Sequence, residues 1–438
     1  MGSLVRRFAL IVAIVAALGC LGPLPPLHTR AAANTYLVNL PGDAGVGSGL
    51  SGDIRYAITQ ANANPGSSIT FDRAATGPTI LLTQTLTLSA SMTITGPGAN
   101  LLAVDGGCTT CDAPVLPPST GATVFVVNLG ATVTLSGLTV QHGLTQLSSS
   151  AGGIVNHGTL ALTGDTLVGN VTVGGFRSGG ALYNDGALTV AASTISGNSA
   201  VFSSPEEGAA LLSNGGTVAL TDTTIAGNTG QAAPFVLSAI LIDGGTATAT
   251  NTTITGNHTG DGGAAGTLNT GALTLTNTIV AGNTASACPD IRNTLISGGH
   301  NLIGDTTCGT GISDGDPQGD IVNPTPLLGA LGAHGGPTQT VPLLTGSPAL
   351  AHGDPAVCAL PLPPASPPNG AGGVDQRGFA RPATVCAIGA YEPQPFAITA
   401  ASVGLPQATV GTAFVPNLAA IVTDNQTNPL PGWSVTFT

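Results

Sequence analysis

Lysine is absent from this chain of 438 residues, and charged side chains make up only 7% of it. Ordinary soluble proteins carry about 25% charged residues, so salt-bridged helices are not expected here. The nine basic residues are all arginine and stand against 21 acidic ones, which leaves a formal net charge of −12. Nucleic acids and anionic membranes are bound through basic patches. The charge balance therefore argues against both as partners.

Aromatic residues are also scarce, at 3%, whereas glycine occurs 64 times. This composition excludes a large aromatic core and suits many short strands joined by tight turns. Beyond residue 33 the sequence has no run of 18 or more apolar residues. A transmembrane helix needs about 20 such residues, so we expect no membrane span in the mature chain.

The first 33 residues have the features of an export signal. Arg6 and Arg7 precede an apolar run at 8–21, and three alanines at 31–33 suit cleavage. We therefore expect residues 1–33 to be a signal peptide and the protein to be secreted or held at the cell surface. The alternative is lipoprotein processing at Cys20, but Ala17 stands where leucine is expected, which disfavours that lipid anchor.

An even number of cysteines follows the signal segment, and in an exported chain this predicts disulfides rather than metal thiolates. Six cysteines allow fifteen connectivities, and sequence alone leaves them open. Proximity along the chain suggests the pairs Cys108–Cys111, Cys288–Cys308 and Cys358–Cys386.

A Gly-Asn pair recurs through the middle of the chain at intervals of 28, 30, 29 and 26 residues. Ten, eight and three residues before each of these asparagines stands a mostly aliphatic side chain. A period in the high twenties, built of short alternating strands, predicts a solenoid whose coils share one apolar interior. The recurring asparagines are Asn170, Asn198, Asn228, Asn257 and Asn283, and the residues ten before them include Leu160, Leu188, Val218 and Leu273.

Fourteen residues before each Gly-Asn asparagine lies a second polar column. Stacked turns place one amide over the next, so we expect both columns to form hydrogen-bonded ladders at the corners of the coils. In this interpretation the asparagines are structural and bind no ligand. The second column consists of Asn156, Asn184, Asn214, Asp243 and Asn269.

These repeats resemble the right-handed parallel β-helix of the pectate-lyase-like class, so we expect an all-β fold. The stretch GDIRYAITQANANPGSSITFD at 52–72 resembles the N-terminal cap of exported bacterial β-helix proteins. There we expect a short helix capped by Ser51. Its buried face is predicted to carry Ile54, Ala57, Ile58 and Ala61.

Two C-terminal segments carry further resemblances. Residues 300–391, with HNLIGDTTC, VDQRGFARP and CAIGAYE in order, resemble the choice-of-anchor Q domain, which implies architecture and compartment rather than an activity. Residues 394–438 resemble the first half of a bacterial Ig-like domain, a partial β-sandwich that is either truncated or an unfinished edge. The expected organisation is a signal peptide at 1–33, a cap at 34–72, β-helix repeats at 73–299, a choice-of-anchor Q-like domain at 300–393 and a partial Ig-like module at 394–438.

Length varies on one side of the repeat only, and such insertions tend to line a binding face. The loops there carry Phe176, Arg177, Phe202 and Phe235, which could hold a glycan or a surface protein. Catalysis is the weaker reading because the candidate residues do not stack in one column. The catalytic candidates are Arg177, Asp185, Glu206 and Glu207.

The DGD sequence at 314–316 offers oxygen ligands for Ca²⁺ in Asp314, Asp316 and Asp320, but it lacks the full calcium-loop pattern. We expect a polar turn there, and no cofactor. Three functions stay open: an adhesin-like protein that binds glycan or protein without catalysis, a polysaccharide lyase or glycoside hydrolase on the same scaffold, and a purely structural surface stalk.

Overall fold

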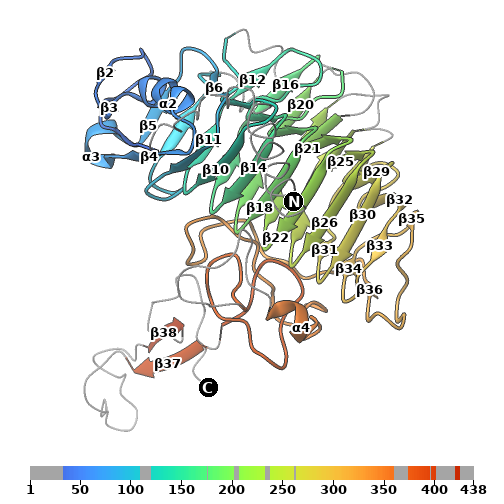
Figure 1. Cartoon of the computed structure of the whole chain (residues 1–438). Helices are drawn as coiled ribbons and strands as arrows, with labels where there is room; N and C mark the ends of the chain where they lie inside the picture. Colours follow the sequence, from blue (N-terminus) through green and yellow to red (C-terminus); the bar gives the residue numbers. More distant parts are fainter. Residues whose placement is uncertain are drawn as a thin grey trace, which may run out of the picture. The chain divides into compact units, whose positions relative to one another are not determined.

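The chain forms a parallel β-helix of about 7 turns. The computed structural model describes residues 33–108, 120–174, 176–201, 207–231, 237–260, 263–359, 373–394, 396–400 and 420–424. Each complete coil contributes one strand to each of four parallel sheets, visited in the order A, B, D and C (Figure 1). No helix within the described ranges is long and apolar enough to cross a membrane.

Sheets A and B form two long walls of the solenoid. Sheet A has 12 strands: β1 (Thr35–Val38), β2 (Gly47–Ser48), β3 (Ser51–Gly52), β4 (Ser67–Phe71), β7 (Met92–Thr95), β10 (Thr132–Ser136), β14 (Thr159–Thr163), β18 (Ala187–Ala191), β22 (Thr217–Thr221), β26 (Thr246–Thr250), β30 (Ala272–Thr276) and β33 (Ile296–Ser297). Sheet B has 10 strands: β5 (Thr79–Leu81), β8 (Ala103–Asp105), β11 (Thr139–Gln141), β15 (Thr166–Val168), β19 (Thr194–Ser196), β23 (Thr224–Ala226), β27 (Thr253–Thr255), β31 (Ile279–Val280), β34 (Leu302–Ile303) and β36 (Ile321–Val322).

Sheets D and C complete each coil. Sheet D has five strands: β12 (Leu144–Thr145), β16 (Val171–Val173), β20 (Ser199–Val201), β24 (Thr229–Gln231) and β28 (His258–Thr259). Sheet C has nine: β6 (Leu86–Leu88), β9 (Phe125–Val127), β13 (Ile154–Asn156), β17 (Leu182–Asn184), β21 (Glu207–Asn214), β25 (Leu237–Asp243), β29 (Ala264–Asn269), β32 (Ile291–Thr294) and β35 (Cys308–Thr310).

Helix α2 (Ile54–Ala63) covers the N-terminal end and packs on β1, β4 and β6. Its buried face is the predicted one, with Ile54, Ala57, Ile58 and Ala61 turned inward. The predicted cap residue was wrong. Asp53, not Ser51, caps the N-terminus of the helix, because its carboxylate accepts the backbone N–H of Tyr56 at 2.8 Å while Ser51 pairs in β3.

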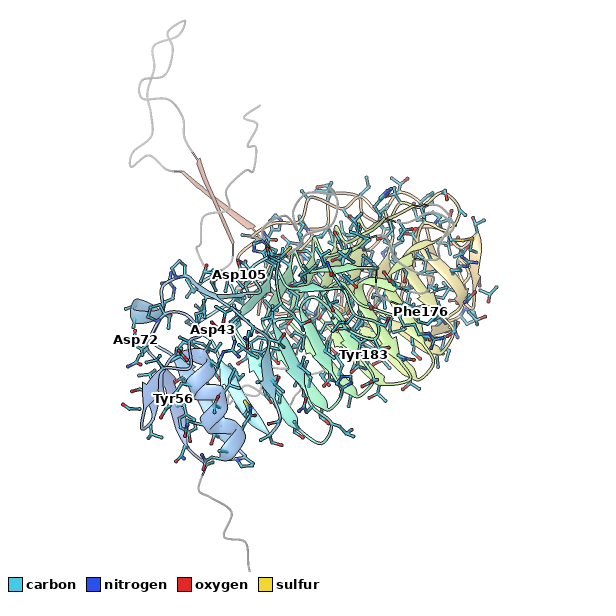
Figure 2. The ribbon with its side chains drawn as sticks, turned by 90° about the horizontal axis from the view of Figure 1, so that it is seen from above. Asp43, Tyr56, Asp72, Asp105, Phe176 and Tyr183 are labelled. Carbon is cyan, nitrogen blue, oxygen red and sulfur yellow. A yellow bond between two sulfur atoms is a disulfide. The ribbon has the colours of Figure 1, made fainter. Side chains whose placement is uncertain are left out.

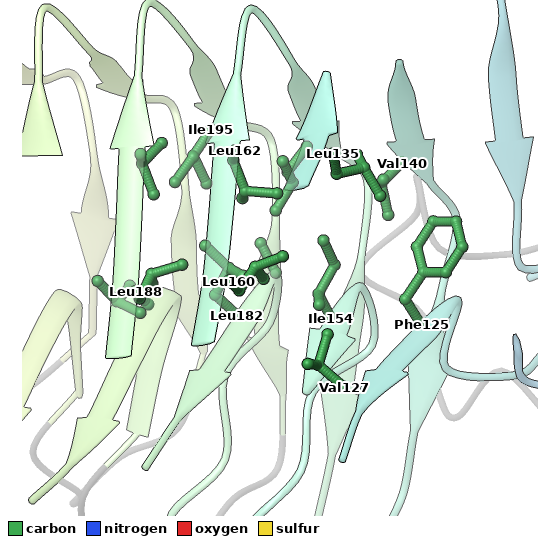
Figure 3. Close-up of a cluster of buried hydrophobic side chains, with 14 of the residues drawn as sticks. Phe125, Val127, Leu135, Val140, Ile154, Leu160, Leu162, Leu182, Leu188 and Ile195 are labelled. Atoms are coloured by element: carbon green, nitrogen blue, oxygen red, sulfur yellow. The ribbon is translucent and has the colours of Figure 1, made fainter. Parts of the chain in front are cut away.

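The shared apolar interior predicted from the repeat is present. The strand register in sheet A places Leu160 next to Leu188 and Leu188 next to Val218. The same row continues through Ala247 to Leu273. All of them are at least 96% buried within one cluster that runs the length of the coils. Figure 3 shows the part of this cluster around Leu160 and Leu188. Each aliphatic side chain buried in this way contributes ~1.5–3 kcal/mol. One coil could not enclose these side chains, so the stack itself is the unit of stability.

The Gly-Asn asparagines form a continuous interior ladder at the corner between sheets B and D. From Asn198 onward, each Oδ1 accepts both the backbone N–H and the Nδ2 of the asparagine one coil earlier, with the Nδ2 to Oδ1 distances at 2.8–3.0 Å. The ladder ends at Asp290, whose carboxylate accepts from Asn283 in the same two ways. The glycine of each pair, not the asparagine, takes the left-handed backbone, for example Gly227 at φ +67°.

The second predicted ladder was only partly right. Asn156 donates to Asn184 at 2.7 Å, but Asn184 then donates to Ser213 because the sheet C register places Ser213 opposite it. Asn214 turns instead to the hydroxyl of Tyr183. The remaining members of the column, Asp243 and Asn269, are likewise out of register with each other, since Ile242 pairs with Asn269.

A further buried polar column, which the sequence reading missed, lies between sheets A and B. Asp165 accepts the backbone N–H groups of Leu138 and Thr163 at 2.9 Å, and Ser193 in the next coil accepts from the N–H of Asp165. Burial raises the pKa of Asp165 to about 8. Burial also raises the pKa of Asp290 to about 6, against the hydrogen bonds from Asn283.

These raised pKa values predict a fold that is more stable in mild acid. The folded state keeps protons on Asp165, Asp222 and Asp290 that the unfolded chain releases, so the free energy of unfolding falls as pH rises from about 4 to about 8. Denaturant titrations across this range will measure it. In an Asp165→Asn variant, the free energy of unfolding should change less with pH above pH 6. Stability that rises over the same interval would contradict the prediction.

Residues 323–359 and 373–394, here called the side segment, pack along the outside of sheet B rather than at the end of the solenoid. Thr194 and Thr224 hydrogen-bond the amide of Gln376, and the hydroxyl of Thr253 accepts the N–H of Ala390. Helices α3 (Arg73–Thr76) and α4 (Pro355–Cys358) are single turns, α4 being part of this segment. Distant coils are thus joined by one stretch of chain.

A buried ion network holds the side segment to its coil. Arg381 is fully buried and reaches Asp222 at 2.6 Å and Glu392 at 3.2 Å. Next to it, Arg377 pairs with Asp375 at 2.6 Å and lies 3.7 Å from the ring centroid of Tyr391. Burial raises the pKa of Asp222 to about 6, although the charge of Arg381 lowers it.

Two disulfides join pairs suggested by proximity, Cys288–Cys308 and Cys358–Cys386. Cys111, the suggested partner of Cys108, lies outside the described residues. Of residues 394–438, the structure describes an antiparallel pair, β37 (Phe396–Ala400) with β38 (Ala420–Asp424).

Candidate functional site

The loops that lead from sheet D to sheet C display apolar side chains on adjacent coils. Leu147 is 69% exposed and Phe176 is 46% exposed. The two loops are tied together, because Ser149 N–H donates to the carbonyl of Phe176 and the Ser178 hydroxyl donates to that of Leu147. These hydrogen bonds fix the backbone at Phe176, whose side chain is exposed on the coils (Figure 2).

Arg177 reaches from this loop to Asp243, the last residue of β25 in sheet C. Its guanidinium lies 5.8 Å from the ring centroid of Phe176, within cation–π range, and forms an ion pair with Asp243 at 2.8 Å. Asp243 also accepts the hydroxyl of Thr270. A planar cation beside an exposed ring offers both a stacking surface and hydrogen-bond donors.

A histidine–carboxylate pair also stands at the C-terminal ends of sheet C strands, directly after β13 and β17. His157 Nδ1 lies 2.9 Å from Asp185 Oδ1, and its ring meets that of Tyr183 edge-on at 6.1 Å. Tyr183 is buried and receives a hydrogen bond from Asn214. We call Leu147, Phe176, Arg177 and the pairs His157–Asp185 and Arg177–Asp243 the sheet C face.

Among the other loop and catalytic candidates, the structure describes Glu207, which does not join this group. Glu207 begins β21 and is fully buried. Phe202, Glu206 and Phe235 lie outside the described residues. Of the catalytic candidates, the structure thus places Arg177 and Asp185 on the sheet C face, each in an ion pair with a different partner.

The three aspartates considered for Ca²⁺ are engaged by the chain itself. Asp316 accepts backbone N–H groups of Gln318 and Asp320, and Asp314 accepts that of Val322. Asp320 is buried and accepts from Asn301. Throughout the described part of the chain, no three His, Cys, Asp or Glu side chains lie close enough to hold a metal ion.

One pocket, of about 440 Å³, opens near the N-terminal coils between Leu82, Asp105, Thr120 and His142. Asp105 Oδ2 lies 2.8 Å from His142 Nδ1 and accepts from Gln141 at 2.7 Å. Burial alone would raise the pKa of Asp105, but the hydrogen bonds from His142, Gln141 and the N–H of Gly107 lower it below the usual value. This places a fixed carboxylate on the pocket wall.

Comparisons with protein families, with curated proteins and with solved structures find no match to this chain. Its fold is a parallel β-helix. The strand pairing alone shows this, and the function has to be argued from the side chains on the coils.

His157 and Asp185 each follow an asparagine of the second column, 28 positions apart, so the repeat aligns them. The Arg177–Asp243 pair gave no signal in the sequence, because its residues are 66 positions apart in different coils. The same is true of Asp105 and His142, which stack through the pairing of β8 with β11. The buried column of Asp165 could have been found, since a hydroxyl or carboxyl residue recurs five positions before each Gly-Asn asparagine.

Proposed function

We propose that this is an exported, non-catalytic surface protein that binds a glycan through the sheet C face. The observation that supports it most is the exposed ring of Phe176 held beside Arg177 and the Asp243 carboxylate. A sugar ring presents a C–H face to an aromatic ring and neighbouring hydroxyls to charged groups. Charged hydrogen-bond partners of this kind are the stronger ones.

Export is supported by the Arg6-Arg7 start with its apolar run, and by the two disulfides, which persist in oxidising compartments. The resemblance of residues 300–391 to the choice-of-anchor Q domain and of residues 394–438 to an Ig-like module supports a cell-surface setting.

Replacing Phe176 by alanine should weaken glycan binding by about tenfold, which corresponds to ~1.4 kcal/mol. The measurement is a glycan array with the full chain, followed by titration calorimetry on the best ligand. Leu101→Ala serves as the matched control, because Leu101 is also an exposed large apolar residue, 45% exposed, but lies between sheets A and B. It should bind as the unaltered chain does.

The opposing outcomes are distinct. Turnover of a polysaccharide that disappears in Arg177→Ala or Asp185→Ala would replace the proposal by a carbohydrate-active enzyme. A blank glycan array together with blank cell binding would leave a structural stalk.

A further inference from the structure

The outward face of sheet A is a two-dimensional array of small hydroxyl and methyl side chains. Along seven consecutive strands from β7 to β30, every position that points away from the core is Thr, Ser or Ala. Apart from the buried Ala191, all of them are at least partly exposed. The positions are Thr93 and Thr95; Thr132, Thr134 and Ser136; Thr159, Ala161 and Thr163; Ala187, Thr189 and Ala191; Thr217, Ala219 and Thr221; Thr246, Thr248 and Thr250; and Ala272, Thr274 and Thr276.

No hydroxyl of this array has a hydrogen-bond partner within the described protein. The Thr163 hydroxyl is buried, whereas the other hydroxyl residues are at least partly exposed and meet water. Sheet B offers an internal comparison, since its outward threonines also stack coil on coil. There the side segment covers them, and Thr194 and Thr224 bond protein groups at 2.5 and 2.6 Å. Sheet A keeps the same kind of column in three parallel rows, with no chain segment bonded to the hydroxyls.

The array is regular in both directions. Strands β10, β14, β18, β22, β26 and β30 lie side by side as an open wall (Figure 1). Equivalent side chains repeat at about 4.8 Å from strand to strand and at about 6.6 Å along each strand. The register is unbroken from β10 to β30. No charged or aromatic residue interrupts these positions.

We infer that the outward face of sheet A binds ice. Threonine hydroxyls at fixed spacing hydrogen-bond water molecules in rows. Water around the neighbouring methyl groups cannot hydrogen-bond to them and bonds to other water molecules instead. Repeats of this size occur between oxygen rows on ice crystal planes, so a rigid array can carry water in positions that fit the crystal. An uncharged face favours this occupant, because charges would hold water in tight shells of other geometry.

A crystalline polysaccharide is the other flat, regular partner to consider. Proteins bind its sugar rings mainly by stacking aromatic side chains on them, and this array has no aromatic side chain. The sheet C face, which carries Phe176, is a different surface of the coil. The ice-binding inference therefore stands apart from the proposed glycan site.

The decisive experiment compares two threonine-to-tyrosine variants of the full chain. Thr248 is exposed in the middle row of sheet A, whereas Thr87 is an equally exposed strand residue in sheet C. Thermal hysteresis and inhibition of ice recrystallisation are measured on the unaltered chain, on Thr248→Tyr and on Thr87→Tyr. Circular dichroism and thermal melting establish that both variants are folded.

The unaltered chain should shape ice crystals and show thermal hysteresis, Thr248→Tyr should lose most of it, and Thr87→Tyr and Phe176→Ala should keep it. Absence of both ice activities in the unaltered chain overturns the inference, as does an equal loss in the two tyrosine variants. Sedimentation with crystalline chitin or cellulose that depends on Thr248, without any effect on ice, would assign the face to a polysaccharide instead. If Thr248→Tyr does not fold, Thr189→Tyr takes its place, because Thr189 lies in the same middle row in another coil.

Discussion

Replacing Arg381 by methionine is expected to lower the free energy of unfolding by about 3–5 kcal/mol, because it leaves a buried charge without its partner. Arg381 is fully buried between Asp222 of the coils and Glu392 of the side segment. Without the guanidinium, the buried carboxylates of Asp222 and Glu392 lose the positive charge that both of them contact. Chemical denaturation followed by circular dichroism measures the loss, and proteolysis should cleave the side segment sooner.

Arg73→Met is the matched control for this variant. Arg73 is a partly exposed arginine that donates to the carbonyl of Leu101 and has no buried carboxylate partner among the described residues, so its removal should cost less than ~1 kcal/mol. The double variant Asp222→Asn with Arg381→Met should recover part of the stability, since it removes one of the carboxylates. A loss for Arg381→Met no greater than that for Arg73→Met would show that the network does not hold the segment.

Replacing Asn228 by alanine in the middle of the ladder is expected to destabilise the fold by about 3 kcal/mol, because several buried polar groups lose their partners at once. The backbone N–H and the Nδ2 of Asn198 would lose their acceptor, and the carbonyl of Ile195 would lose its donor. None of these groups reaches water, since Asn228 and Asn198 are at most 1% exposed.

The neighbouring Asn214 supplies the comparison for the ladder. It is partly exposed and makes one hydrogen bond, to the Tyr183 hydroxyl at 3.1 Å. Asn214→Ala should therefore cost about 1 kcal/mol or less. Equal effects of the two alanine variants on the denaturation midpoint would mean that the continuous ladder adds nothing beyond single hydrogen bonds.

The scaffold was predictable because its physics is periodic. Leu160, Leu188 and Val218 recur at fixed distance from a Gly-Asn pair, and a shared interior is the one arrangement that buries them all. The same spacing predicted the Asn170–Asn198 ladder. The column of Asn184 and Asn214 failed for a local reason, since a shift of one residue in the sheet C register moves Ser213 into the stacked position.

The candidate sites were less accessible to this reasoning. Phe176 and Arg177 were marked by their position in a loop of variable length, and the structure places both on one face. Their relation to Asp243 depends on how far a side chain reaches across two coils, which no spacing rule contains. The hydroxyl array on sheet A was present in the sequence as alternate Thr and Ala residues, but only the register turns that alternation into rows.

By itself the sequence determined the coil, its apolar interior and the Asn170 ladder, because each depends on residues at regular separation. Proximity along the chain only suggested the pairs Cys288–Cys308 and Cys358–Cys386, which the structure contains. Tertiary structure alone decided where the side segment packs, which carboxylates become buried, and which outward face stays open to water. Those outcomes join groups as distant as Asp222 and Arg381, 159 positions apart. Contacts between such groups form only when the side segment packs on the folded coils. The spacing of residues along the sequence carries no information about that packing.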